Sequence, residues 1–505
     1  MLLTLPLGAN NLQLSNMQAS TSDLSFDISW ENSWNVSSAP NNWDAVWVII
    51  KFQDCATETK RWSHLTLSTN NADHSITGGV LQVDAVSDGM GVFIRRTSTG
   101  AGNTGLASCT LTFSSAFSSI TDLNFEVIGI EMVYVPQNSF YVGDGSTASP
   151  PLSQNAMGSS GASSPYLITS ENAISTNTLA NTSQGAPTNH DAIPAAFPKG
   201  YAAFYCMKYE ISQELYMRFL NTLPATHQGN RTAVAVTASA GTLALAPAAS
   251  PKRNAIRIEV PASNSPLRPA VYGLDLNNNG TFNEATDGAN IACNYLSWYD
   301  FLALLDWAAL RPMTELEYEK AARGPSSAGT PVLAAYCWNT TNILQADAGA
   351  LNNAGLDNEV STTSGNGLCA FNSANNSHGP LRTGFAATSI SNREQSGASY
   401  YGIMELSGNV WEQCLHIGHS NGFGNGAAPI FSGVLGDGEL DALGNANALN
   451  WGGNSNSAWR SIVRGGNWNQ AGSNCQLSNR SAITGAGAEN NLRNARTGGR
   501  GVRQP

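Results

Sequence analysis

Short apolar runs separated by clusters of Asn, Ser, Gly and Asp are the feature that most constrains the fold of the first part of the chain. "LSFDISW", "AVWVIIKF", "GVLQVDAV", "GVFIRRT" and "CTLTF" are apolar or alternate between apolar and polar residues. Runs of this length, bounded by turn residues, are typical of antiparallel strands. Residues 1–127 are therefore predicted to form an all-β sandwich domain.

Helices are expected at only a few places, and each has a signal at its start. The predicted N-caps are Ser212, Ser297 with Asp300 as its capping-box partner, and Thr314 with Glu317 as its partner. The residues between about 144 and 196 are rich in Ser, Ala, Asn, Thr and Gly, which indicates an extended surface loop. Residues 128–505 are therefore predicted to be an α+β domain with long loops.

Charged residues are scarce, and this limits the classes of partner. They make up 12% of the 505 residues, and the formal net charge is −11, which argues against general nucleic-acid binding. No run of 18 apolar residues exists, so we expect no membrane insertion. The first residues, "MLLTLPLGANNLQ", lack a positively charged start and give no clear signal peptide. A surface made polar by Asn, Ser, Thr and Gly suits an extracellular, cell-surface or virion-exposed protein.

The cysteines and the C-terminal arginines each allow two interpretations. The eight Cys contain no CxxC pair and are too sparse for a disulfide scaffold, so most are expected to be free and buried. From Arg464 onward there are six Arg and one acid, Glu489. These arginines could form an anion-facing patch, or they could be structural hydrogen-bonding side chains in a loop-rich fold. The structural interpretation is favoured.

Five motifs occur in order: "IEMVYVPQNSFYVGD", "YEISQELYMRFL", "LRPMTELEYEKAARG", "MELSGNVWEQC" and "VRGGNWNQ". Together they closely resemble the formylglycine-generating enzyme/sulfatase-modifying factor family, over about residues 128–505. The resemblance implies a C-type-lectin-like fold, with a small twisted sheet, two main helices and long irregular loops. The closing "GGRGVR" stands where family members commonly have Gly-Phe-Arg, although Arg503 is still expected to close the sheet.

The resemblance also suggests an enzyme, but the key residues differ. Oxidases of the family hold copper with two cysteines separated by four residues, and here the matching positions are Gln470 and Cys475. An amide cannot replace a thiolate as a Cu(I) ligand. We therefore expect no enzymatic activity and no required cofactor. A formylglycine-generating-type oxidase acting on a protein cysteine remains the alternative. A His-rich iron site, found in related iron enzymes, is not visible.

The final segment resembles a different branch of this fold, the variable proteins of diversity-generating retroelements. In those proteins adenine-rich codons such as those of Asn are rewritten, and around residues 464–505 Asn, Ser, Thr and Gly surround Trp468, Cys475 and Arg480. The sequence thus predicts a diversified ligand-binding protein, such as a phage tail tip or a bacterial surface adhesin. It would bind a protein or glycan receptor on a target cell, and the N-terminal domain would attach to a particle or surface. The polar residues of this segment are expected to point mostly outward, with Trp468 and Arg480 as supports. The predicted ligand-binding residues are Asn467, Trp468, Asn469, Gln470, Ser473, Asn474, Gln476, Ser478, Ser481 and Thr484.

Two further motifs suggest metal sites. "DLNNNGTFNEATDG" resembles a calcium loop, but Thr286 stands where a bidentate Glu is expected. A structural calcium ion and an Asx-turn loop without metal both remain open for it. "CLHIGH" places Cys, His and His within six residues, as in the start of a zinc site, but no partner pair is evident. The predicted calcium ligands are Asp275, Asn277, Asn279, Asn283 and Asp287.

Overall fold

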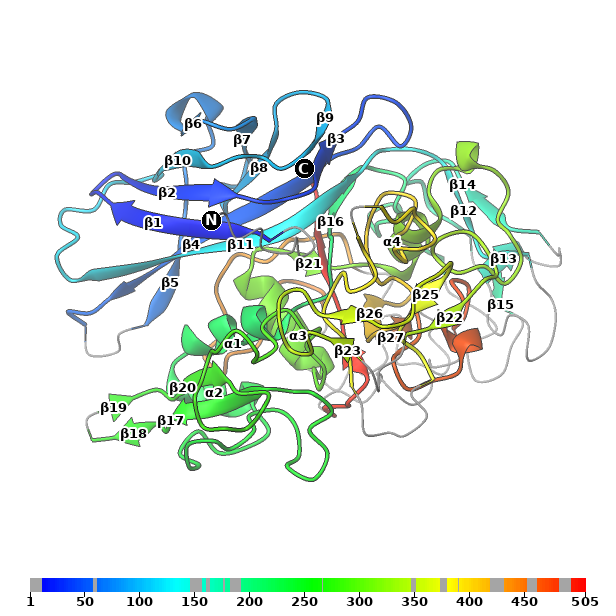
Figure 1. Ribbon diagram of the computed structural model, residues 1–505. Helices are drawn as coiled ribbons and strands as arrows, with labels where there is room; N and C mark the ends of the chain where they lie inside the picture. The colour runs from blue at the N-terminus through cyan, green and yellow to red at the C-terminus, as the bar shows by residue number, and fades with distance from the viewer. Residues whose placement is uncertain are drawn as a thin grey trace, which may run out of the picture.

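A computed structural model describes most of the chain, and strands and loops dominate it (Figure 1). Among the described residues, no helix is both long and apolar enough to cross a membrane. The described residues are 11–57, 61–145, 157–159, 164–175, 178–181, 192–265, 267–346, 351–372, 379–388, 390–417, 431–451, 461–480 and 492–505.

A four-stranded antiparallel sheet lies at the N-terminal end of the molecule. Its middle strand β2 alternates as the sequence predicted, because Leu24, Phe26 and Ile28 are buried while the residues between them are partly exposed. Strand β1 is polar and has no such alternation, and the sequence analysis missed it. The strands, in spatial order, are β1 (Gln13–Ala19), β2 (Asp23–Ser29), β10 (Ala107–Thr112) and β6 (Ser75–Thr77).

A larger, eight-stranded sheet faces the first one and connects distant parts of the chain. Every strand pair in it is antiparallel. Seven strands, in spatial order, are β21 (Arg311–Pro312), β29 (Gly501–Arg503), β16 (Phe204–Met207), β11 (Leu123–Val135), β4 (Asp44–Asp54), β8 (Val92–Arg96) and β7 (Leu81–Ala85), and β5 (Trp62–Leu65) also pairs with β4.

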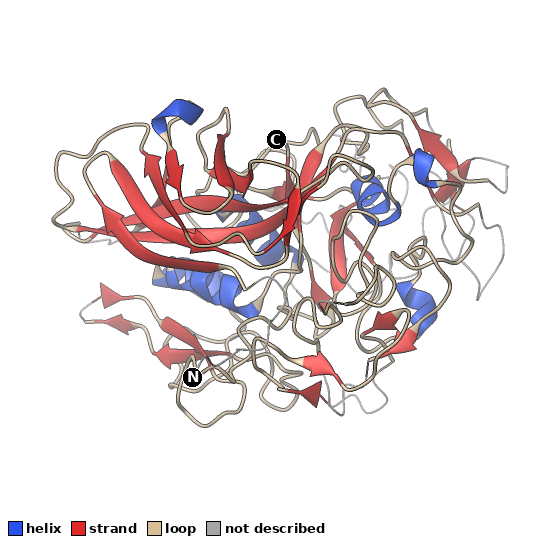
Figure 2. Cartoon of the chain, turned by 45° about the horizontal axis from the view of Figure 1, so that its top comes forward, coloured by secondary structure: helices blue, strands red, loops and turns tan. Residues whose placement is uncertain are grey.

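Strand β4 is buried on both faces, which places it between two hydrophobic cores. Val46, Val48 and Ile50 pack against the four-stranded sheet. The alternate residues, such as Trp47 and Ile49, pack against helices on the other face. Figure 2 shows these helices beneath the strands of the large sheet. A strand covered on both sides reads as a continuous apolar run, which explains the sequence "AVWVII".

The domain boundary expected between residues 127 and 128 falls inside β11. This strand pairs with β4 without a break from Leu123–Asp54 to Val133–Asp44. The larger sheet therefore continues past residue 127 and joins N-terminal strands to strands of the C-terminal region. The reason is that β11 uses its first half in the N-terminal core and its second half in the cores of the C-terminal region.

The three predicted helix starts are confirmed. Ser212 caps the first helix, while Ser297 and Thr314 each form a complete capping box. Helix α2 was not predicted, because its N-cap is Pro224, which makes no side-chain capping hydrogen bond. The helices are α1 (Gln213–Asn221), α2 (Ala225–Arg231), α3 (Trp298–Trp307) and α4 (Glu315–Arg323), with short 3₁₀ turns at Asn71–Asp73, Ser326–Ala328 and Gly472–Cys475.

A second core lies around α4 and a three-stranded sheet near the C-terminus. Tyr318 and Ala321 of α4 belong to this core, together with Ile462 and Val502. The three strands, in spatial order, are β27 (Ser461–Arg464), β26 (Trp411–Leu415) and β28 (Thr497–Gly498).

The remaining strands form short pairs within the loops. They are β3 (Ser33–Asn35) with β9 (Gly100–Gly102), β12 (Phe140–Val142) with β14 (Tyr166–Ile168), β13 (Met157–Ser159) with β15 (Leu179–Asn181), β17 (Ile256–Val260) with β20 (Val271–Leu274), β18 (Ser263–Asn264) with β19 (Leu267–Arg268), β22 (Leu344–Gln345) with β25 (Leu368–Cys369), and β23 (Leu351–Asn352) with β24 (Val360–Ser361).

Candidate functional site: the C-terminal polar loop

The polar loop, defined here as residues 465–479, leaves the end of β27 and returns to Arg480. Both of its flanking arginines bind one carboxylate. Arg464 Nη1 lies 3.2 Å from Glu315 Oε2, and Arg480 Nε and Nη2 lie 2.8 and 3.0 Å from Glu315 Oε2 and Oε1. Arg464 also pairs with Glu319, one turn further along α4. The two ends of the loop are thus held at the start of a single helix.

The charges at this anchor are stabilised by one another. Burial alone would raise the pKa of Glu315, but the charges of Arg480, His416 and Arg464 lower it, and the net pKa lies below the usual Glu value. Burial would lower the pKa of Arg464, but Glu319 and Glu315 raise it overall. Both groups therefore stay ionised, and the N-terminus of α4 favours the negative partner. Paired and buried in this way, they fix the position of the loop ends.

Glu315 and Glu319 were not among the predicted site residues. Their motif, "TELEYE", was read as the start of a helix with its capping box. The signal that could have revealed them was the number of acids. α4 carries three carboxylates, all buried, and only Glu317 is used by the cap, so Glu315 and Glu319 need another partner. Buried acids need buried cations, and the C-terminal arginines supply them.

Half of the predicted ligand-binding residues that the structure describes lie where a ligand could reach them. The side chains of Asn469, Gln470, Ser473 and Asn474 are partly exposed, around the exposed Ala471. We call residues 469–474 the tip of the polar loop. Ser481 and Thr484 lie outside the described residues.

The expectation that the predicted residues point outward is wrong for Asn467, Gln476 and Ser478, which are buried. Asn467 folds back on its own turn: its Oδ1 accepts a hydrogen bond from Asn469 N at 2.9 Å, and its Nδ2 donates to Gln470. Ser478 Oγ accepts a hydrogen bond from Arg323. These short polar side chains satisfy buried polar groups inside the loop, which sequence composition alone does not distinguish from contact with a ligand.

Trp468 is buried, as expected for a supporting residue. Its side chain is 2% exposed, and its Nε1 donates to Ala495 O at 3.0 Å. The ring packs against Val410 and Leu381 in a small core of its own. Trp468 therefore connects the polar loop to the segment that leads into β28.

The two motif positions of the family oxidases do not form a pair of thiols. Position 470 is Gln, and its carbonyl oxygen accepts a hydrogen bond from Asn372 N at 2.8 Å. Cys475 is fully buried, and its nearest thiol partner is Cys369. Burial, together with Cys475, raises the pKa of Cys369 well above the usual value. The raised pKa favours the neutral thiol of Cys369, whereas metal binding and nucleophilic attack need a thiolate.

The structural interpretation of the C-terminal arginines is confirmed for five of the six. Besides Arg464 and Arg480, the remaining three each contact a carboxylate. Arg493 Nε lies 2.9 Å from Asp300, Arg500 Nη2 lies 2.5 Å from Glu412, and Arg503 Nη2 lies 2.6 Å from Asp88. These arginines are used for internal pairing.

The cysteines follow the prediction as well. All eight are free, and all but Cys55 are buried. Cys414 and His416 of the "CLHIGH" motif are both buried, while His419 lies outside the described residues. Within the described parts of the chain, no three His, Cys, Asp or Glu side chains are grouped as metal ligands.

The loop after β20, predicted as a calcium loop, is organised by its own backbone N–H groups. Asp275 accepts from Asn279 N and Gly280 N, at 3.0 and 3.1 Å. Asp287 accepts from Leu276 N and Glu284 N, and the Arg257 guanidinium lies 3.9 Å from Asp275.

The amides of this loop are used in the same way. The side-chain oxygens of Asn277, Asn279 and Asn283 accept from Asn279 N, Thr281 N and Leu274 N. Asn277 and Asn279 each accept from the N–H two residues ahead, which is the geometry of consecutive Asx turns. These contacts need no metal, and the prediction of a calcium ion stays a prediction.

Comparison with known proteins agrees with the motifs. Residues 176–504 match the family model described as "Sulfatase-modifying factor enzyme 1-like domain". None of the curated proteins matches the chain. One solved structure, titled "pH-induced modulation of Streptococcus parasanguinis adhesion by Fap1 fimbriae", is similar at 13% identity over 32% of this chain and 82% of that chain. Its TM-score is 0.11, so this likeness carries no argument.

Proposed function

The chain belongs to the sulfatase-modifying factor family, and from this premise we propose that it is a ligand-binding member that uses the tip of its polar loop to contact a target. The observation that carries the proposal is the double attachment of the loop to Glu315. Both ends are fixed by buried ion pairs, while residues 469–474 between them are partly exposed. A recognition loop needs this division between a fixed base and an adaptable contact surface.

The proposal includes a C-type-lectin-like fold and diversification by a retroelement. The Asn and Ser residues at the tip are the types that adenine-directed rewriting would start from or produce. Exchanging them would leave the Glu315 pairs and the Trp468 ring in place, so many tip sequences could share one fold. The target would be a protein or glycan receptor, and the N-terminal strands would attach the chain to a particle or to a cell surface.

The first prediction compares two displayed libraries. One library randomises the tip residues Asn469, Gln470, Ser473 and Asn474. The tip library should retain protease resistance in most members, because exposed substitutions usually change stability by less than about 0.5 kcal/mol each. It should also yield binders when selected against an immobilised model protein such as lysozyme.

The matched control library randomises the buried Asn467, Gln476 and Ser478. Most of its members should lose protease resistance, since their new side chains would have to fit buried polar positions. Equal resistance in the two libraries, or failure of the tip library to yield any binder, would contradict the proposal.

The second prediction is that the chain does not oxidise a substrate cysteine. Gln470 and the buried Cys475 offer no pair of accessible thiolates. After incubation with Cu(I), oxygen and a peptide carrying the sulfatase motif, mass spectrometry should find the peptide cysteine unchanged. A formylglycine product, absent from a parallel reaction without the protein, would instead favour the oxidase alternative.

A further inference from the structure

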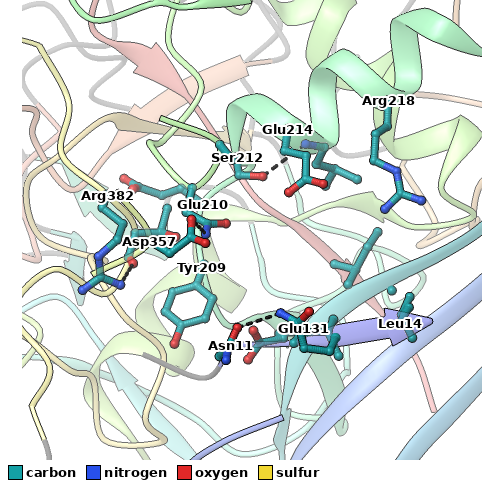
Figure 3. Close-up of a pocket in the computed structure, with 18 of the residues that line it drawn as sticks. Asn11, Leu14, Glu131, Tyr209, Glu210, Ser212, Glu214, Arg218, Asp357 and Arg382 are labelled. Carbon is teal, nitrogen blue, oxygen red and sulfur yellow. Dashed lines mark hydrogen bonds between the residues drawn. The ribbon is translucent and has the colours of Figure 1, made fainter. Parts of the chain in front are cut away.

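A cavity of about 680 Å³ lies where the N-terminal strands meet the start of α1. Figure 3 shows Glu214 and Arg218, from α1, opposite Leu14 and Glu131, from strands β1 and β11. Its volume is within the range of small-molecule sites. No residue of the polar loop lines it, so this cavity is separate from the surface proposed above.

The cations in the cavity wall already have partners. Arg218 Nε lies 2.8 Å from Glu126 Oε1, and its Nη2 donates to Val127 O. Arg382 is buried, and its guanidinium donates to the carbonyl oxygens of Glu359, Thr383 and Gly384. Neither guanidinium is therefore available as the main contact for an anionic ligand.

The carboxylates in the wall outnumber these cations. The wall contains Glu131, Glu210, Glu214 and Asp357. In the described part of the chain, the Glu214 carboxylate makes no hydrogen bond or ion pair, although its backbone N–H donates to Ala289 O at 3.0 Å. That backbone bond and the Ser212 cap fix the first turn of α1, so the carboxylate is held at the cavity.

Apolar side chains also line the cavity. Leu215 follows it on α1, and Met17, on the edge strand β1, is 46% exposed. Leu356, from the loop between β23 and β24, also lines the cavity. A ligand in contact with all of these would therefore meet a negative charge at one end and hydrocarbon along its length.

We propose that this cavity is a binding site for a small organic cation, whose ammonium group pairs with Glu214 and whose hydrocarbon chain lies against Met17 and Leu215. An anion would be repelled by the carboxylates of the wall, because both guanidiniums are already paired. A neutral molecule would not pair with the Glu214 carboxylate. The charge and the apolar contacts together select an alkylammonium ion. The site does not depend on the function proposed for the polar loop.

The test uses three probes of equal length: hexylamine, hexan-1-ol and hexanoate. Calorimetric titration of the full chain should show saturable binding of hexylamine that weakens as salt is added. Hexanol should bind at least roughly fivefold more weakly, and hexanoate should not bind. The Glu214→Gln variant should weaken hexylamine binding roughly fivefold, the effect of one partly exposed ion pair.

Two variants make the result specific. Glu259→Gln removes a charge from β17, outside the cavity wall, and should leave hexylamine binding unchanged. Met17→Ser should weaken binding of both the amine and the alcohol, because it removes a shared apolar contact. Thermal unfolding of each variant checks its fold. Absence of hexylamine binding, equal binding of hexanol, or full binding by a folded Glu214→Gln variant would each overturn the proposal.

Discussion

Trp468 is the largest apolar side chain of the polar loop. Its neighbours in the sequence are polar residues of the kind found in exposed loops. Its ring lies in a core with Val410 and Leu381, and its indole N–H is paired with Ala495 O. Substituting this residue therefore removes buried area and leaves a cavity and an unpaired carbonyl. The stability of the loop depends on this ring as well as on the charges at Glu315.

The prediction at this scale is that Trp468→Ala lowers the free energy of unfolding by about 3–5 kcal/mol. Urea unfolding followed by circular dichroism measures the change. Asn474→Ala, six residues along at the partly exposed tip, is the control and should shift the free energy by no more than about 0.5 kcal/mol. A Trp468→Ala variant as stable as the control would mean that the ring is not part of the core.

Residue types alone could predict which positions of the polar loop are apolar supports, but not which polar residues are buried. Trp468 was expected to support the loop, and it is buried. Asn467 and Ser478 look identical in type to Asn474 and Ser473, yet the first two are buried and the latter two are partly exposed. The difference comes from Arg323 and from the turn at Asn469, contacts that arise only in the folded chain.

At the scale of elements, the start of a helix could be predicted where one capping side chain determines it. Ser297 and Thr314 each bind the N–H three residues ahead, so their helices could be predicted from the capping box. Strand β1 could not, because its polar sequence "QLSNMQA" becomes a strand only by pairing with β2. Pairing depends on the partner strand, which local patterns do not identify.

The loop after β20 leads to a prediction about metal removal. Asp275 and Asp287 receive backbone hydrogen bonds, and Arg257 supplies a positive charge near Asp275. We therefore expect the melting temperature to be the same in EDTA and in excess calcium. If instead calcium binds the native state, saturation at about 100 times its Kd would add about 2.7 kcal/mol of stability, and the melting temperature would rise. Magnesium at equal concentration is the control for ionic strength.

At the scale of the whole molecule, the large sheet unites regions that the sequence separates. β4 and β11 pair at eleven positions, from Leu123–Asp54 to Val133–Asp44. β11 then pairs with β16, and β16 pairs with β29 at the C-terminal end. The family resemblance correctly identified the C-terminal region, but it carried no information on how the preceding strands join it.

This continuity predicts that residues 128–505 do not fold alone. Without β4, the fragment exposes Ile128 and Ile130 and leaves the β11 edge unpaired. Its thermal unfolding should lack a cooperative transition, whereas the full chain should show one. As a control, cleavage of the full chain in the exposed loop at residues 114–116 should leave two fragments that remain associated, because β11 and β4 stay paired. A fragment that melts like the full chain would contradict this expectation.

The place of β29 inside the sheet has a consequence for biosynthesis. β16 lies between β11 and β29, but residues 501–503 are translated about 300 residues after β16, or about 15–60 s later at usual rates. Until then one edge of β16 has no strand beside it. The polar loop is translated before β29, so a frameshift within its codons loses the closing strand. Such a product would leave the ribosome with an open sheet edge and become a substrate for chaperones and proteases. The position of the last strand thus makes closure of the large sheet depend on translation of the whole chain.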